Sequence, residues 1–144
     1  MSIEKKEQDM RKRIENSFAR QTMMQTFGAR LREIAQGRVV ITAPILPIAT
    51  QQQGHGHAAL SFAIGDTAAG YAALTALEPG MEVVTAEIKI NLLAPARGDL
   101  LIATGRLEKA GRRLCVVTAR VQARDGAGLR DVALLQGTMA PVPA

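Results

Sequence analysis

One continuous apolar segment, from Ala58 to Leu77, constrains the fold of this chain more than any other part of it. The segment is rich in alanine and leucine, is too long for a strand, and is followed by Pro79 and Gly80, which end helices. Apolar side chains fall on nearly every side of the predicted helix, and a helix of that kind is buried. Its one charged residue, Asp66, argues against a membrane-spanning helix.

Strand patterns lie on both sides of this helix. A short β-branched run, Val39 to Ile45, precedes it, and a clear period of two follows over residues 82–93. Three further strands, at about residues 100–109, 113–124 and 129–142, are joined by short turns and must pair as hairpin neighbours. This order predicts an α+β fold in which an antiparallel sheet carries one long helix on its face.

The first part of the chain has a helical pattern instead. Apolar residues recur three, four or six positions apart over residues 2–36, and charged residues fill the gaps. We expect an amphipathic helix in two pieces, with Gly28 as the interruption and Gly37 as the C-terminal stop. Residues 1–37 would then form a helical extension, and residues 38–144 the main domain.

Composition limits the classes of function. The net charge of +5 favours a polyanionic ligand, but no more than three basic residues are consecutive and aromatic residues make up only 3%. Nucleic-acid binding is therefore disfavoured. Two histidines, His55 and His57, with no cysteine or carboxylate nearby in sequence, are too few to bind a metal. The lone cysteine, Cys115, lies in an apolar run and is expected to be buried and inert. The polar first residues and the lack of a spanning segment predict a cytoplasmic protein that does not bind membranes.

Asp66 is the strongest functional candidate. A carboxylate is rarely buried, and aspartate is a weak helix former away from a helix N-terminus. A structural role, in which Asp66 caps a break at Gly65 or pairs with a distant arginine, explains the position equally well from the sequence alone. A second signal lies at the predicted helix start, where Gln51, His57 and the N–H of Ala58 offer hydrogen-bond donors to an oxyanion.

The spacing of these groups has a consequence for assembly. Asp66 lies eight residues after Ala58, which corresponds to about 12 Å along a helix axis. One carbonyl group cannot contact both. If both serve one reaction, Asp66 must come from a second copy whose helix runs antiparallel, with two equivalent sites at the interface.

Three segments of the chain together resemble a known family. QQQGHGHAALSFAIGDTAAGYAAL, VVTAEIKINLLAPARGDLLIATGRLEKAGRR and LLQGTMAPV are similar to the hotdog acyl-CoA thioesterases of the phenylacetyl-CoA (PaaI-like) and 4-hydroxybenzoyl-CoA type. The resemblance covers about residues 38–142 and implies a curved antiparallel sheet wrapped around a central helix, with an added N-terminal helix. It also implies a homodimer or a dimer-of-dimers homotetramer with sites at the interface between protomers.

The resemblance also implies roles for individual residues. Asp66 falls on the catalytic carboxylate, which acts as nucleophile or as general base, and Gln51 falls on the side chain that contacts the thioester carbonyl. Ala58 supplies the backbone N–H that polarises this carbonyl, His57 matches the motif histidine, and Thr85 falls near a hydroxyl that orients water. The sequence departs from the family motif HGG, because it has His-Ala-Ala at residues 57–59.

The substrate implied is an acyl-CoA, with no separate cofactor because CoA is part of the substrate. Four cations in or beside turns would contact the CoA phosphates: Arg97, Lys109, Arg112 and Arg113. Taken singly, each also fits an ordinary solvated turn residue. Two other functions stay open at this point: a non-catalytic acyl-CoA-binding protein, which the His-Ala-Ala departure favours, and a hotdog dehydratase or hydratase.

Overall fold

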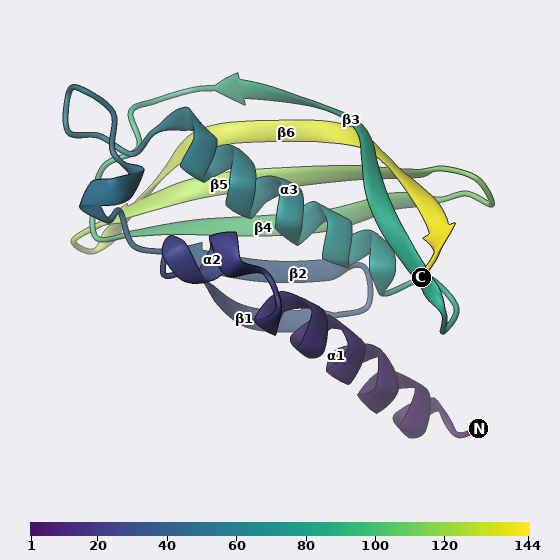
Figure 1. Ribbon diagram of the computed structural model, residues 1–144. Coiled ribbons are helices and arrows are strands. Elements are labelled where there is room, and N and C mark those ends of the chain that lie inside the picture. Colours follow the sequence, from purple (N-terminus) through teal and green to yellow (C-terminus); the bar gives the residue numbers. More distant parts are fainter.

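A computed structural model describes residues 1–144 and shows one curved, six-stranded antiparallel sheet around helix α3, Ala58–Leu74 (Figure 1). The other helices are α1 (Ile3–Ala19), α2 (Thr22–Thr26) and a 3-10 turn, Pro47–Ala49. In their order across the sheet, the strands are β1 Arg30–Ala35, β2 Arg38–Ala43, β4 Leu100–Ala110, β5 Cys115–Asp125, β6 Gly128–Pro143 and β3 Met81–Leu92. The predicted α+β hotdog architecture, including the added N-terminal helix, is confirmed.

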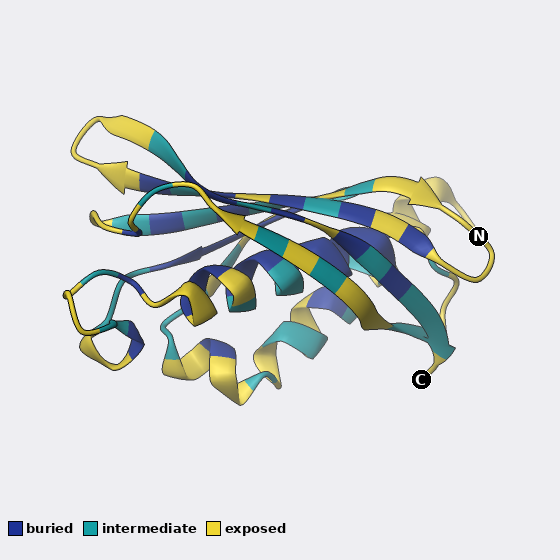
Figure 2. Cartoon of the chain, turned by 90° about the horizontal axis from the view of Figure 1, so that it is seen from above, coloured by how far each residue is buried: buried dark blue, intermediate teal, exposed yellow.

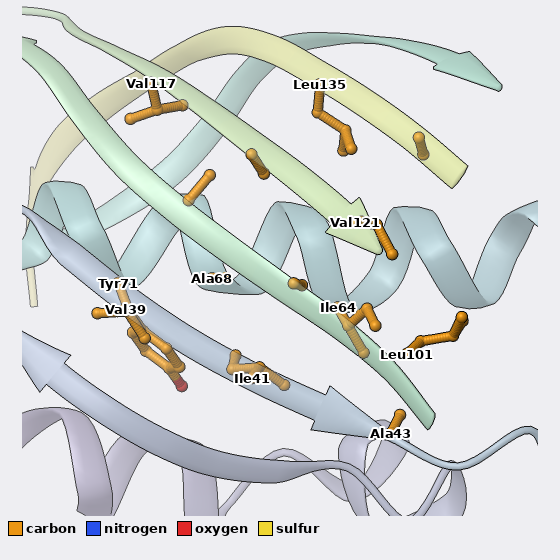
Figure 3. Packing of buried hydrophobic residues seen from close by; sticks show 14 of the residues in the cluster. Val39, Ile41, Ala43, Ile64, Ala68, Tyr71, Leu101, Val117, Val121 and Leu135 are labelled. Carbon is orange, nitrogen blue, oxygen red and sulfur yellow. The ribbon is translucent and has the colours of Figure 1, made fainter. Parts of the chain in front are cut away.

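The core lies between α3 and the concave face of the sheet. All helices lie on that side, and the opposite face carries none (Figure 2). Ile64 and Ala68 of α3 point at strand residues such as Ile41 and Val121, and all four are fully buried (Figure 3). Because few side chains here are aromatic, the core is built from small aliphatic groups and depends on close packing. No helix combines the length and the apolar character needed to cross a membrane.

Glycine allows α3 to approach the sheet closely. A Cβ atom added to Gly105 of β4 would lie 2.2 Å from the carbonyl carbon of Ala68 and 2.4 Å from the nitrogen of Ala69. Both atoms belong to the backbone of α3, so no side-chain movement could relieve such a contact. The absence of a side chain at Gly105 therefore fixes the distance between the helix and β4.

Helix α1 is held against the C-terminal end of α3. The Arg13 guanidinium donates hydrogen bonds to the carbonyl oxygens of Leu74 (2.9 Å), Leu77 (2.9 Å) and Glu78 (2.8 Å). These carbonyls lie at and just beyond the C-terminal end of α3, where a cation is favourable. A second anchor is Tyr71, whose hydroxyl accepts a hydrogen bond from the Gln21 amide at 2.6 Å.

The helix predicted over residues 2–36 is wrong beyond residue 26. The break between the two helical pieces lies at Arg20 and Gln21, not at Gly28. Gly28, with φ of 67°, instead ends α2, because its N–H bonds to the Gln25 carbonyl and the next N–H bonds to Met24. Gly37 occupies the turn of the β1–β2 hairpin rather than a helix end. Residues 30–35, expected in the helical extension, form an edge strand of the sheet.

Strand β3 is the other edge of the sheet and carries an irregularity in the middle. Its pairing with β6 shifts between Thr85 and Glu87, so Ala86 is an extra residue that has no partner. Thr85 pairs with the buried Met139, whereas Glu87 pairs with Thr138 on the outer face. The bulge therefore turns Thr85 toward α3, although Thr85 and Glu87 belong to the same polar row in the sequence pattern.

Candidate active site

The N-terminus of α3 is organised by His57. This residue is the N-cap, and its Nδ1 atom accepts a hydrogen bond from the N–H of Ala59 at 2.9 Å. An accepting Nδ1 carries no proton, so the neutral ring holds its proton on Nε2. The N–H of Leu60 bonds to the His57 carbonyl, and the N–H of Ala58 has no partner within the protein. One backbone donor at this helix end is thus free for a ligand.

Gln51 lies in the loop that leads into α3, and its side chain shapes that loop. Its Oε1 atom accepts hydrogen bonds from the backbone N–H groups of Gln53 (2.5 Å) and His55 (3.3 Å). Its Nε2 atom contacts only the Gln53 side chain, at 3.3 Å. The loop is also tied to the 92–96 segment by a hydrogen bond of 2.7 Å from Gly56 to the Ala96 carbonyl. The Gln51 amide can therefore donate to a ligand while its oxygen stays engaged.

These groups line one groove of about 460 Å³. One wall is formed by residues 51–58 and the other by residues 92–96. Gln51, His57 and Ala58, which the sequence predicted as site residues, all lie on it. His55 is half-buried and lines the same groove.

Asp66 does not lie in this groove. It is half-buried near the middle of α3, and its Oδ1 atom accepts a hydrogen bond from the Thr85 hydroxyl at 2.7 Å. Burial raises the pKa of the Asp66 carboxyl above its ordinary value of 3.8, and the hydrogen bond from Thr85 opposes this rise. The structure thus brings Asp66 together with Thr85, and Gln51 together with His57 and Ala58, but keeps the two groups apart within one chain.

The four predicted phosphate-binding cations also fall into two places. Arg97 follows directly after the groove wall at residues 92–96, near the N-terminus of α3. Lys109, Arg112 and Arg113 lie at the other end of β4, in and beside its hairpin with β5. Because β4 has 11 residues, about 33 Å separates the two ends. One protomer cannot apply all four charges to a single ligand phosphate group.

A larger hollow, of about 810 Å³, lies on the outer face of the sheet and contains none of the predicted site residues. Four of its polar side chains form hydrogen bonds with each other. Thr138 donates to Glu87 at 2.9 Å, and Thr118 donates to Glu108 at 2.7 Å. Because this hollow contains no predicted site residue, the candidate site is placed at the groove and at Asp66 despite the smaller volume.

One groove residue was missed from the sequence. Ser61 lies one turn after Ala58 on α3 and lines the groove, although only 2% of its surface is exposed. Ser61 is three residues from Ala58, so the two are neighbours on one face of the helix. This spacing is the signal in the sequence that could have identified Ser61. In the sequence it reads as one small polar residue within an apolar helix.

Comparisons with known proteins agree on one family. Residues 53–129 match the model of the thioesterase superfamily. A thioesterase family protein from Silicibacter pomeroyi is 35% identical, with a TM-score of 0.91 over 94% of this chain and 99% of that chain. No curated protein matches this chain.

More distant structures share the fold. The PaaI protein from the phenylacetic acid degradation operon of E. coli is 20% identical, with a TM-score of 0.83 over 94% of each chain. A thioesterase from Haemophilus influenzae is also 20% identical, with a TM-score of 0.80 over 89% of this chain and 87% of that chain.

Proposed function

Because this chain belongs to the thioesterase superfamily and has the hotdog fold, we propose that it hydrolyses acyl-CoA thioesters to a free acid and CoA. One observation carries this proposal: a carboxylate in the middle of an apolar helix, Asp66, faces the open edge of the sheet and is held by Thr85. A buried acid with a raised pKa that is positioned by a hydroxyl is typical of a catalytic group.

In the proposed mechanism the thioester carbonyl oxygen accepts hydrogen bonds from the Ala58 N–H and the Gln51 amide. Asp66 either attacks the carbonyl carbon or takes a proton from the water that attacks it. The tetrahedral intermediate collapses, the carbon–sulfur bond breaks, and CoA leaves as a thiolate. A thiolate is a good leaving group, so no strong general acid is needed. No cofactor takes part, since CoA is a portion of the substrate.

The site is completed by a second copy of the chain. β3 is an edge strand with unpaired backbone groups, and its side chains Val84 and Leu92 are 51% and 58% exposed. Antiparallel pairing of two β3 edges about a two-fold axis would cover them. The same axis makes the two α3 helices antiparallel, so that Asp66 of one copy approaches the groove of the other. A homodimer is the smallest active unit in this proposal, and a homotetramer would be a pair of such dimers.

The same symmetry would bring Arg97 of one protomer close to the cations at the other end of β4 in the second copy. In an antiparallel dimer, the end of one protomer that carries Lys109, Arg112 and Arg113 lies on the same side as the Arg97 end of the other copy. The CoA phosphates would then meet cations from both protomers. The proposal places the reaction in the cytoplasm, as the sequence predicts.

The experiment is CoA release, trapped with a thiol reagent, from a panel of aryl, short, medium and long acyl-CoAs. The wild-type protein should turn over at least one class, and Asp66→Asn should lower kcat by roughly 10²–10⁴-fold. The thermal midpoint of this variant at pH 7 should not fall. Burial opposes the ionised form of Asp66, so a neutral amide removes an unfavourable charge.

Two outcomes would contradict the proposal. Equal turnover by the wild-type protein and Asp66→Asn would remove Asp66 from the mechanism. Tight binding of acyl-CoA with no CoA release from any ester would instead support a non-catalytic acyl-CoA-binding protein.

A further inference from the structure

Ser61 differs from the other buried hydroxyl residues of the protein. Three residues with polar side chains are buried: Thr42, Ser61 and Thr75. Thr42 accepts a hydrogen bond from Arg32 at 3.1 Å, and Thr75 donates to the Ala72 carbonyl at 2.7 Å. The Ser61 hydroxyl has no protein partner, although nearly all buried polar groups have one. It is not sealed off either, since Ser61 lines the groove beside α3.

The position of Ser61 relates its hydroxyl to the proposed carbonyl site. It lies three residues after Ala58, a rise of about 4.5 Å along the helix axis. Because side chains on a helix lean toward its N-terminus, the hydroxyl leans toward the turn that carries the free Ala58 N–H. Both groups open into the same groove, whose facing wall includes the apolar side chains of Leu92 and Leu93. No side chain on that wall carries a hydrogen-bonding group, so an oxygen of the ligand is the natural partner of the hydroxyl.

We propose that Ser61 determines specificity by hydrogen bonding to an oxygen on the third carbon of the acyl group, so that 3-hydroxyacyl-CoA or 3-oxoacyl-CoA esters are the preferred class. This inference rests on the proposed function. With the thioester oxygen at the Ala58 N–H, Ser61 lies one helical turn further along, a rise of about 4.5 Å, and this spacing suits oxygens on the first and third carbons of one chain. A hydroxyl both donates and accepts, so it can pair with either substituent. An acyl chain without this oxygen leaves Ser61 buried and unpaired, which lowers its affinity.

The test compares two esters that differ by one oxygen, 3-hydroxyhexanoyl-CoA and hexanoyl-CoA. The wild-type protein should show kcat/KM at least about tenfold higher for the hydroxylated ester. In Ser61→Ala this ratio should fall to near one, because the hydroxylated ester loses its hydrogen bond and hexanoyl-CoA no longer leaves a buried hydroxyl unpaired. Thr26→Ala is the matched control, because it deletes an exposed hydroxyl on α2 and should leave the ratio unchanged.

An unchanged ratio in Ser61→Ala, with both esters turned over, would overturn the assignment. Ser61→Cys keeps the size of the side chain and weakens its hydrogen bonding, so it should lower the ratio even if the alanine variant is unstable. If the wild-type protein hydrolyses neither these esters nor any other acyl-CoA of the panel, the proposed function fails. Because the esters then stay intact, titration calorimetry can measure their affinities. The ratio of the affinity for 3-hydroxyhexanoyl-CoA to that for hexanoyl-CoA is then compared between the wild-type protein and Ser61→Ala. Equal affinities for the two esters in both proteins would overturn the role of Ser61 as well.

Discussion

At the scale of single residues, the chemistry depends on two opposing influences on one carboxyl group. Burial raises the pKa of Asp66, while the Thr85 hydroxyl, at 2.7 Å, favours the ionised form and lowers it. A raised pKa keeps the carboxylate basic, and the hydrogen bond keeps it ionised and fixed in direction. Thr85 thus sets both the orientation of Asp66 and the lower end of its working pH range.

The pH dependence of Thr85→Val follows from this balance. Activity needs the Asp66 carboxylate, so kcat/KM should rise with pH along an acidic limb whose midpoint lies above 3.8. The valine variant removes the hydrogen bond that lowers the pKa, so its acidic limb should move to higher pH. The measurement is a profile of kcat/KM between about pH 4 and 8 for both proteins.

The outer face of the same sheet provides a control for this measurement. Thr138→Val removes a hydroxyl that bonds to Glu87 at 2.9 Å on that face and should leave the acidic limb where it is. An equal shift in both variants, or a shift of Thr85→Val to lower pH, would contradict a direct effect of Thr85 on Asp66.

The sequence allowed candidate site residues to be named, but it could not give their hydrogen bonds. Asp66 was found because a charge in an apolar helix breaks the local pattern, whereas the N-cap role of His57 could not be told from a role in contacting substrate. Ser61 was missed because a small polar residue is unremarkable in any helix. Its interest comes only from a lack of hydrogen-bond partners, which a sequence cannot reveal.

At the scale of elements, the position of α3 depends on its contact with β4. The helix backbone passes so close to Gly105 that a methyl group has no room there. Every group at the N-terminus of α3, and Asp66 itself, takes its position from this packing. The glycine is therefore a structural requirement of the site, although it touches none of the site residues named above.

Gly105→Ala should lower the free energy of unfolding by about 3 kcal/mol, since the new Cβ would lie 2.2 Å from the Ala68 backbone. Urea unfolding followed by circular dichroism measures this change. Gly128→Ala is the matched control, because its added Cβ would meet nothing closer than 3.8 Å and should change the stability little. Equal stability of the two variants would mean that α3 can move away from β4 without cost.

Two features that the sequence missed, strand β1 and the outward-facing Val84 in the correctly predicted strand β3, each arise from a β-bulge. Leu31 and Ile34 are three residues apart, a helical spacing, yet both face the core from β1 because the pairing shifts between Leu31 and Glu33. In β3 the bulge at Ala86 interrupts the alternation over residues 82–93, leaving Val84 51% exposed while Val83 packs on the core. A bulge adds one residue without altering composition, so the period of the sequence pattern cannot locate it.

At the scale of the whole molecule, the two halves of the proposed site lie on one chain but cannot meet within it. The carboxylate lies about 12 Å along α3 from the free Ala58 N–H. Beside Asp66 is the open β3 edge, where a second copy can add. The spacing of Asp66 and Ala58 along α3 was predictable from the sequence. The edge position of β3 was not predictable, because it depends on the order of the strands in the sheet.

Mixing two inactive variants tests this arrangement. In a dimer with shared sites, a homodimer of either Asp66→Asn or Gln51→Ala has two inactive sites. Gln51→Ala should lower activity by about 10²–10³-fold, because the thioester carbonyl loses a hydrogen-bond donor. Co-expression should place one intact site in each mixed dimer, so activity should recover to roughly a quarter of the wild-type value.

A double variant controls for this recovery. Asp66→Asn co-expressed with Asp66→Asn/Gln51→Ala should stay inactive, because no carboxylate remains in any site. If the activity of the Asp66→Asn and Gln51→Ala mixture does not exceed the average activity of these two variants alone, each site lies within a single chain.

The strand order also determines when this geometry can form as the protein is made. β3 has only one neighbour in the sheet, β6, and Glu87 meets Thr138 51 residues later in the chain. At a translation rate of about 5–20 residues per second, β3 waits roughly 3–10 s for its partner to emerge. Thr85 pairs with Met139 in the same ladder, so the hydroxyl that orients Asp66 takes its place only after Met139 has been synthesised.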